Sequence, residues 1–523
     1  MIGSVLLIPV EDFGRSNFIE KISNKYSLRR DDDEQYQYIY NYLEKIGCNH
    51  FLVENNYVDR DYLNDYSNYY VSCYRQYERK CKRLHFFKKL DEKKFNDIIT
   101  GKLDPDEYHP EITESYLGFM VVKPLPQTII GRTVLKTYDN TITEGNDQIG
   151  SRSIRTLRPY HANLFGIEIR IDSLAFQEQD TVVAACATSA IWSALQKACY
   201  LWGYYIPTPY EITTSSTRYE HSNRPIPSTG LTLTQMAHGI REVGLEPQVF
   251  ECIDFNTKRL KLPFLSICYS YLRAGIPVIL CVDIEESGGH AITLTGYKLS
   301  EMNEINEFSI VEPSLRTLNL TGSKIVTLYG HDDQIGPFSR IKMESDPDNQ
   351  MISLITDWKF DDGRKKKAIP LNIIVPIYHK IRISTLSLLK NYIYGMDHFL
   401  KSTNIFMDNS QFEWDIFLSD INLFKSEILR SREVMNKNSI LTMPHPRFFW
   451  RIIGTYQGTR LFEFLADATD MERSFQFFNL IFYNEDLYLI FKDLFVERYR
   501  EDISSYTGTH LFDFVETLIG DIK

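Results

Sequence analysis

The feature that most constrains the fold is the order of segments in the middle of the chain, where helical patterns come first and strand patterns follow. An Ala-rich helical segment ends near Gly203, and a possible capping box at Thr232 and Gln235 predicts a further helix. Segregated helices and strands predict an α+β domain. The helical segments are 182–203 (VVAACATSAIWSALQKACYLWG) and 263–274 (PFLSICYSYLRA), and the strand segments are 276–284 (IPVILCVDI) and 290–299 (HAITLTGYKL).

The chain of 523 residues is too long for one ordinary core, so two or three domains are expected. Residues 35–100 have aromatic and apolar positions at spacings of three and four, which predicts helices. Residues 116–138 are rich in β-branched side chains and predict two or three strands. The segment 343–350 (MESDPDNQ) resembles a linker, and helical patterns dominate after about residue 370. We therefore expect an N-terminal α+β domain (1–165), a central domain (166–345) and a mainly helical C-terminal domain (346–523).

Composition excludes several classes of protein. Hydrophobic residues make up 43% and charged residues 24% of the chain, as in globular proteins. The formal net charge is -11 and no long basic stretch offsets it, so nucleic acid is not an expected partner. There is no run of 18 apolar residues and no basic region before the short apolar start, so neither a membrane partner nor secretion is expected. The irregular spacing of the cysteines does not predict a disulfide framework, which favours a cytoplasmic location.

Cys186 is the candidate nucleophile because it lies in the first turn of the predicted central helix. A thiol attacks as the thiolate, and the N-terminus of a helix stabilises that negative charge. Ala184, Ala185 and Ala187 are small neighbours that would let a substrate backbone come close. The alternative for this position is a small buried cysteine that only packs the helix.

His290 is the candidate base. It lies in the segment 286–297 (ESGGHAITLTGY), where Gly288 and Gly289 precede it and a strand follows. The two glycines leave space and backbone freedom, so a histidine at the entrance of a strand can face a cleft. A lone histidine beside a strand is usually structural, but this one follows a helix-opening cysteine by about a hundred residues.

Two further residue types complete the predicted site. A catalytic base needs an acceptor on its second ring nitrogen, and Asp332 or Asp333 could supply it from the segment 328–338 (LYGHDDQIGPF). We favour Asp332 and interpret His331 as its neighbour, while two aspartates before Gly-Pro are also typical of an ordinary turn. Gln179 lies seven residues before Cys186 and could donate to a developing oxyanion together with the backbone N–H of Cys186. Gln177 competes for this role, and a simple loop glutamine is the alternative.

The order of glutamine, helix-borne cysteine, strand-borne Gly-His and strand-end aspartate resembles papain-like cysteine peptidases, especially their bacterial C39-like branch. In that family the cysteine attacks a carbonyl carbon, the histidine moves the proton, an aspartate or asparagine orients the histidine, and the glutamine lines the oxyanion hole. By position, the resemblance implies these roles for Cys186, His290, Asp332 and Gln179, and it covers about 175 of the 523 residues.

The chain departs from the family pattern in three places. The glutamine lies seven residues ahead of the cysteine, where about six is usual. Ala187 follows the nucleophile where a tryptophan often does, and Glu312 in 307–313 (EFSIVEP) lies nearer the family's position for the acid than Asp332. These departures leave the identity of the acid open.

The resemblance implies a cysteine peptidase that cuts a peptide or isopeptide bond in a protein or peptide substrate, without a cofactor or a metal. The flanking domains are then expected to choose the substrate or to hold the site closed. The same constellation can catalyse acyl transfer or glutamine deamidation, and a catalytically silent interaction protein is a further alternative.

Two other signals have simpler interpretations. A metal site at Cys73, Cys81 and His85 is one interpretation of that segment. No fourth ligand is evident, so incidental thiols in a helical core are the better interpretation. The basic run 364–367 lies in the charged segment 361–369 (DDGRKKKAI), for which a solvated hairpin is the better interpretation.

Overall fold

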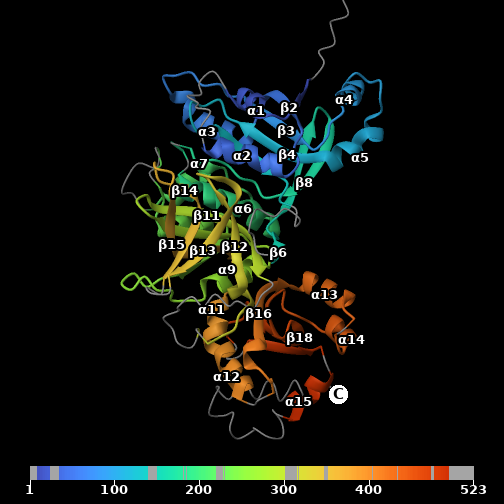
Figure 1. The fold of residues 1–523 in the computed structure, drawn as a ribbon, viewed down its shortest axis with the longest axis vertical. Helices are drawn as coiled ribbons and strands as arrows, with labels where there is room; N and C mark the ends of the chain where they lie inside the picture. Colours follow the sequence, from blue (N-terminus) through green and yellow to red (C-terminus); the bar gives the residue numbers. More distant parts are fainter. Residues whose placement is uncertain are drawn as a thin grey trace, which may run out of the picture.

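The molecule has three units that follow one another along its long axis (Figure 1). The computed structural model describes residues 9–23, 34–138, 150–180, 182–183, 185–219, 226, 228, 230–300, 315, 317–346, 351–402, 405–432, 434–472, 476–483 and 485–493. The N-terminal unit lies at one end, the C-terminal unit at the other, and the unit with the candidate nucleophile between them. Each unit combines helices with an antiparallel sheet, which confirms the predicted α+β class.

The N-terminal unit is built on a five-stranded sheet whose antiparallel strands follow one another in chain order. Its strand β4 (Tyr116–Val122) is buried along its whole length, which accounts for its unbroken apolar run. Strands β7 (Arg158–Leu164) and β8 (Ile167–Ser173) form a separate hairpin. The remaining elements are β1 (Val10–Asp12), α1 (Arg15–Ile22), α2 (Glu34–Lys45), β2 (His50–Tyr57), α3 (Arg60–Asn68), η1 (Tyr70–Ser72), β3 (Cys81–Phe87), α4 (Glu92–Ile99), α5 (Pro105–Ser115) and β5 (Ile130–Leu135).

The central unit is an antiparallel sheet that closes on itself. Strand β10 (Val278–Ile284) pairs with β11 (Gly288–Ser300) on one side and with β15 (Lys365–Tyr378) on the other. The ring is completed by strands that pair in chain order, so its members have partners on both sides. These strands are β12 (Ile325–Asp332), β13 (Gly336–Asp346) and β14 (Met351–Lys359), while β6 (Gly150–Ser153) and β9 (Leu245–Glu251) pair with the ends of β11 and β15.

Helix α6 (Cys186–Trp202) packs against this sheet and begins at the candidate nucleophile. Gly203 ends it in the left-handed conformation, at φ +73, as predicted. The hydroxyl of Thr293 in β11 donates to the carbonyl oxygen of Ala190 at 2.6 Å, which ties the first turns of the helix to the strand that carries His290. The other helices of this unit are α7 (Pro209–Ser216), α8 (Leu233–Glu242), α9 (Phe264–Leu272) and η2 (Thr321–Lys324).

The predicted cap of α8 is confirmed, because Thr232 and Gln235 form both hydrogen bonds of a capping box. Gly244 follows the helix with a positive φ, as a helix-ending glycine does. One buried cluster joins Trp192 of α6 and Ala291 of β11 with Phe119 of β4. The N-terminal sheet and helix α6 therefore share a hydrophobic core.

The C-terminal unit contains a four-stranded antiparallel sheet and docks on α9. Asp415 accepts from the hydroxyl of Tyr269 at 2.9 Å and pairs with Arg273, and all three groups are buried or nearly so. The elements are α11 (Thr385–Leu388), η3 (Leu389–Ile393), α12 (Tyr394–Ser402), η4 (Asn409–Gln411), β16 (Phe412–Asp420), α13 (Ile421–Arg430), α14 (Lys437–Thr442), β17 (Phe448–Tyr456), β18 (Thr459–Asp467), β19 (Phe477–Phe482) and α15 (Glu485–Lys492).

Paired strands cross both predicted domain boundaries. The boundary after residue 345 cuts the central ring, because β14 and β15 complete it. The first four residues of the linker-like segment, 343–346, belong to β13. The boundary after residue 165 falls in the turn between β7 and β8.

Two secondary-structure predictions are wrong. The C-terminal domain was expected to be mainly helical, but β16 to β19 form a sheet there. Residues 81–87 form strand β3 and not a helix. In β3 and β17 most residues are buried whichever way they face, so the alternation that identifies a strand is absent from the sequence.

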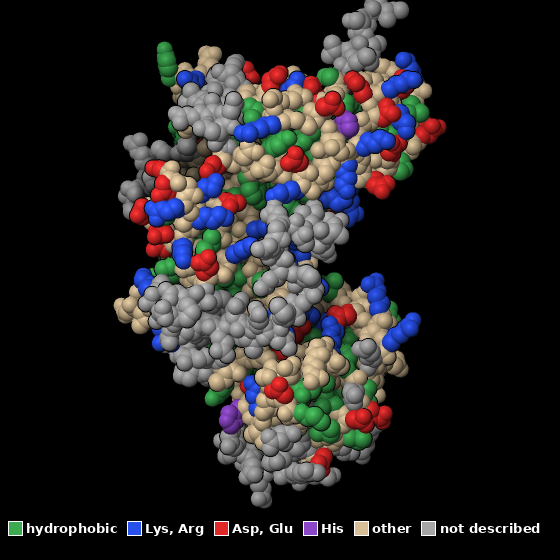
Figure 2. Space-filling model, viewed as in Figure 1, with side chains coloured by type: hydrophobic (Ala, Val, Ile, Leu, Met, Phe, Trp, Pro, Cys, Tyr) green, Lys and Arg blue, Asp and Glu red, His purple; other side chains and the backbone are tan. Residues whose placement is uncertain are grey.

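The surface of the described residues mixes both signs of charge. On the face shown in Figure 2, Lys and Arg side chains lie among Asp and Glu side chains over the N-terminal and central units. In the hairpin between β14 and β15, Lys365 pairs with Asp357 at 3.0 Å and Lys367 pairs with Glu344 at 3.0 Å. Within the described part of the chain, none of the helices combines the length and the apolar character that a membrane span requires.

We predict that Gly336→Ala destabilises the chain, because the hairpin between β12 and β13 touches α2 at this residue. Gly336 has φ +151, and an added Cβ would lie 2.4 Å from Cδ1 of Tyr38. The free energy of unfolding, measured with urea, should fall by about 3 kcal/mol. Gly363→Ala is the matched control, since Gly363 also has a positive φ in a hairpin but has nothing within 4 Å of an added Cβ; it should cost about 1 kcal/mol. Equal losses in the two variants would contradict this contact.

Candidate functional site

Cys186 is the first residue of α6 and is half-buried. Ala185 precedes it in an extended conformation and provides no side-chain cap, and the first turn contains no acidic residue. The positive end of the helix dipole is therefore neither capped nor neutralised by a side chain of its own first turn. A negative charge placed at this end of a helix interacts favourably with the dipole.

The loop before Cys186 is held by hydrogen bonds from three directions. The carboxylate of Asp180 accepts from the backbone N–H of Val182 at 2.8 Å and of Val183 at 3.1 Å. The hydroxyl of Tyr70, from the N-terminal unit, donates to Asp180 at 2.6 Å. The hydroxyl of Thr213 in α7 donates to the carbonyl oxygen of Val183 at 2.8 Å. Val182 and Val183, which shortly precede Cys186, are thus held in place by side chains that include one of the N-terminal unit and one of α7.

His290 lies near the start of β11 and joins the two other members of the predicted triad. Its Nε2 lies 3.0 Å from Oδ1 of Asp332, and the thiol of Cys186 is near enough to raise the pKa of the imidazole. Since Nε2 faces the carboxylate, Nδ1 is the ring nitrogen left for the thiol. Gly288 and Gly289 are exposed, and an added Cβ would meet nothing within 4 Å at either.

The surroundings of His290 favour its protonated form. Burial by itself lowers the pKa of the imidazole, but the charge of Asp332, the hydrogen bond to it and the nearby thiol of Cys186 outweigh burial. The pKa of His290 is therefore held well above its ordinary value. An imidazolium beside a thiol is what stabilises a thiolate–imidazolium pair.

Asp332 is fully buried, and both of its carboxylate oxygens are bound. Oδ1 accepts from His290 and from the backbone N–H of Gln334 at 3.0 Å. Oδ2 accepts from the indole N–H of Trp358 at 2.9 Å. The ring of Trp358 also meets the ring of His290 edge to face, with centroids 6.2 Å apart. These contacts leave the carboxylate one orientation, with Oδ1 toward the imidazole.

Asp333 lies beside this pair and is buried as well. Its Oδ1 is 3.5 Å from Nε2 of His290, farther than the oxygen of Asp332. Burial raises the pKa of Asp333, His290 lowers it and Asp332 raises it, which together place it at about 7. Of the two aspartates considered from the sequence, the structure places Asp332 closer to the imidazole.

The remaining residues considered from the sequence are His331, Gln177, Gln179 and Glu312. His331 is a structural neighbour, because Nε2 lies 3.0 Å from the carbonyl oxygen of Leu174 and Nδ1 accepts from the N–H of Phe338. Burial lowers the pKa of His331 to about 3, so it stays neutral. Gln177 is buried and Gln179 half-buried, and an oxyanion role for either stays a prediction. Glu312, the alternative acid, lies outside the described residues.

The remaining thiols lack the setting of Cys186. Cys281 is half-buried in β10, and burial, with a smaller effect of Cys186, raises its pKa to about 12. Cys81 is buried in β3, and burial raises its pKa above the ordinary value. His85 meets the hydroxyl of Tyr116 at 2.9 Å, and burial lowers its pKa to about 4. His85 is thus engaged in the N-terminal core and not aimed at a thiol pair.

The residues of the site offer ligand atoms, and those of His290 and Asp332 already have partners. His290, Asp332 and Asp333 present a nitrogen and two carboxylate oxygens within 4.8 Å of one another. Within the group, Nε2 of His290 and Oδ1 of Asp332 are joined by a hydrogen bond, and Oδ2 of Asp332 is held by Trp358. The arrangement is that of an oriented imidazole, and acid–base chemistry on the thiol is what it supports.

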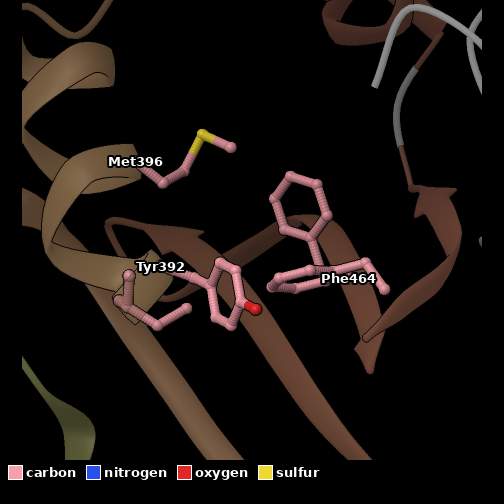
Figure 3. Close-up of a pocket in the computed structure, with 5 residues that line it drawn as sticks. Tyr392, Met396 and Phe464 are labelled. Carbon is pink, nitrogen blue, oxygen red and sulfur yellow. The ribbon is translucent and has the colours of Figure 1, made fainter. Parts of the chain in front are cut away.

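A hollow in the C-terminal unit has a different character. It is lined by apolar and aromatic side chains, among them Tyr392, Met396 and Phe464 (Figure 3). The hydroxyl of Tyr392 donates to Gln476 at 2.5 Å. The lining contains no nucleophilic thiol and no imidazole, so this hollow does not compete with the site at Cys186.

Two supporting residues could not be found from the sequence. Trp358 lies outside the expected central domain and reaches Asp332 only because β14 joins the ring. Gln35 of α2 donates to the backbone carbonyl of Asp333 at 2.8 Å, across 298 positions of sequence. Neither residue has a local sequence signal, since each acts through a pairing of distant elements.

We predict that Trp358→Phe destabilises the chain more than Trp192→Phe does. Both tryptophans are buried, but Trp358 donates to a carboxylate whereas Nε1 of Trp192 has no hydrogen-bond partner among the described residues. Loss of a hydrogen bond to a charged group should make the difference about 2 kcal/mol in the free energy of urea unfolding. A difference near zero would show that the indole does not support Asp332.

The protonation of His290 predicts a pH dependence of stability. Its pKa is higher in the folded chain than in the unfolded chain, so its contribution to stability is full below about pH 6.5 and is lost as the pH rises through the folded value. We expect the urea midpoint to fall more steeply between pH 6.5 and 9 for the parent chain than for His290→Gln. Parallel slopes would contradict a raised pKa at this residue.

Comparisons with known proteins give no family for this chain. Models of protein families gave no match, and a search of curated proteins gave no match either. The chemistry of the site therefore has to follow from the residues that form it.

Proposed function

We propose that this chain is a papain-like thiol hydrolase that cleaves a peptide or isopeptide bond in a protein substrate. The observation that carries the proposal is the row of three side chains in which the thiol of Cys186 meets the imidazole of His290 and that imidazole meets Asp332. A helix-borne cysteine against an antiparallel sheet is the arrangement expected for such an enzyme. The eight cysteines are all free thiols.

The first half-reaction forms an acyl-enzyme. The thiolate of Cys186 attacks the carbonyl carbon, and the negative charge on the carbonyl oxygen is held by the backbone N–H of Cys186 and by a glutamine amide, for which Gln179 is our assignment. The imidazolium of His290 gives its proton to the leaving nitrogen as the carbon–nitrogen bond breaks. The amine leaves, and the acyl group stays on sulfur as a thioester.

The second half-reaction releases the acyl group. His290, now neutral, takes a proton from water while the water oxygen attacks the thioester carbon. The carbon–sulfur bond breaks, the acid product leaves, and the thiolate–imidazolium pair returns. Asp332 stabilises the imidazolium in both halves and keeps its ring oriented.

We predict that Cys186 reacts with a peptidyl vinyl sulfone far faster than the other half-buried thiols, Cys73 and Cys281. Mass spectrometry of labelled peptides at pH 7 gives the three rates in one sample. His290→Ala should slow labelling of Cys186 by about 100-fold, and Asp332→Asn should slow it less, because it leaves the imidazole in place. Similar rates at all three thiols would instead indicate a catalytically silent protein.

The bond that is broken can be identified with the same variants. A cell lysate incubated with the parent chain should gain new peptide N-termini that are missing with Cys186→Ala. Conversion of glutamine to glutamate without new N-termini would indicate a deamidase, and incorporation of an added amine would indicate acyl transfer. Cys186→Ala should keep the urea midpoint of the parent, since one small side chain replaces another at a half-buried position.

A further inference from the structure

Asp333 has a position that neither the turn nor the triad explains. The carboxylate that binds within the turn is that of Asp332, which accepts from the N–H of Gln334. The side chain of Asp333 is 2% exposed, and neither of its oxygens has a hydrogen-bond partner among the described residues. A buried carboxylate without such partners is costly unless a positive charge faces it. The group that faces it is His290, 3.5 Å away.

The backbone of Asp333 is fixed, so its carboxylate cannot turn to solvent at low cost. Gln35 of α2 donates to its carbonyl oxygen at 2.8 Å, and the N–H of Ile335 donates to the carbonyl oxygen of Asp332 at 3.1 Å. The hydroxyl of Tyr38 in α2 donates to the carbonyl oxygen of Pro337 at 2.9 Å. The contact between the N-terminal unit and the hairpin thus holds the second carboxylate against the imidazole.

Few charged groups other than Asp333 act on His290. On the elements around His290, Asp332 is the other carboxylate and Cys186 the other titratable group that act on the imidazole. Trp358 of β14 is neutral, and Asp283 of β10 is exposed. Glu34 and Lys359, the sequence neighbours of Gln35 and Trp358, pair with each other at 2.9 Å.

We propose that Asp333 is a positioning residue, a second carboxylate on His290 that widens toward alkaline pH the range in which Cys186 and His290 remain an ion pair. The proposal rests on the proposed function, because it concerns the nucleophile of that site. Asp333 touches neither the substrate nor the reacting sulfur and acts through His290.

The protonation of Asp333 beside His290 explains why the ion pair is extended toward alkaline pH. Burial and Asp332 raise the pKa of Asp333 to about 7, against the opposite effect of His290. The carboxyl group is therefore neutral in acid and gives its proton to water near neutrality. Its negative charge appears in the range where an ordinary histidine would lose its own proton, and that charge keeps the proton on His290.

The test is the rate at which iodoacetate alkylates Cys186, measured by mass spectrometry from pH 5 to pH 10. An imidazolium attracts this anionic reagent, so the rate falls when His290 loses its charge. In Asp333→Asn the alkaline fall should move to lower pH by about one unit or more. The matched control Asp361→Asn changes an exposed aspartate of the hairpin between β14 and β15 and should leave the profile unchanged.

The outcomes separate this inference from the proposed function. In one outcome the parent chain shows a fast plateau in the alkylation rate, while the rate of Asp333→Asn falls at the same pH as that of the parent. In that case the role inferred for Asp333 is wrong and the proposed thiol site stands. If Cys186 of the parent reacts no faster than Cys73 at any pH, the proposed function itself fails. A uniform drop of the Asp333→Asn rate at all pH values, without a displaced fall, would show a purely structural role and would also overturn the inference.

Discussion

The register between β11 and β12 is the constraint on which the site depends. The two strands are antiparallel, with Thr293 opposite His331, and continuing that pairing puts Ile292 opposite Asp332. His290 and Asp332 are then diagonal neighbours on the same face, a separation that long polar side chains can bridge. A slip of one residue would turn Asp332 to the other face of the sheet and present its neighbour instead. The bond between imidazole and carboxylate is therefore a consequence of strand pairing, and the buried faces of the ring are what fix that pairing.

Features determined by a few consecutive residues were predictable from the sequence. Helix α6, its end at Gly203, the cap of α8 and the strand of His290 all follow from local composition and turn chemistry, and the structure has each of them. Cys186 and His290 could be proposed as a pair because a helix N-terminus and a glycine-flanked strand entrance are both recognisable in the sequence. The residues of the candidate site lie where local signals are strongest.

Features that depend on pairing between distant strands were not predictable in the same way. No pattern within residues 343–378 shows that β14 and β15 close the central ring, so Trp358 could not be assigned to the site. The choice between Asp332 and Asp333 depends on a register that one sequence does not display. The strands of the C-terminal sheet escaped prediction because burial on both faces removes their alternation.

The N-terminal unit supports the candidate site directly, through hydrogen bonds and ring contacts. Two carboxylates beside one imidazole repel each other, and the hairpin that carries them would relax toward solvent if nothing held it. Gln35 and Tyr38 bind the backbone of that hairpin from α2, and the ring of Tyr42 stacks on Phe338 with centroids 6.2 Å apart. Tyr70 of the same unit fixes the loop before Cys186 through Asp180. The segments that carry Asp332 and Cys186 are thus both held by one neighbouring unit, so any movement of that unit relative to the central ring would alter the distances between sulfur, imidazole and carboxylate together.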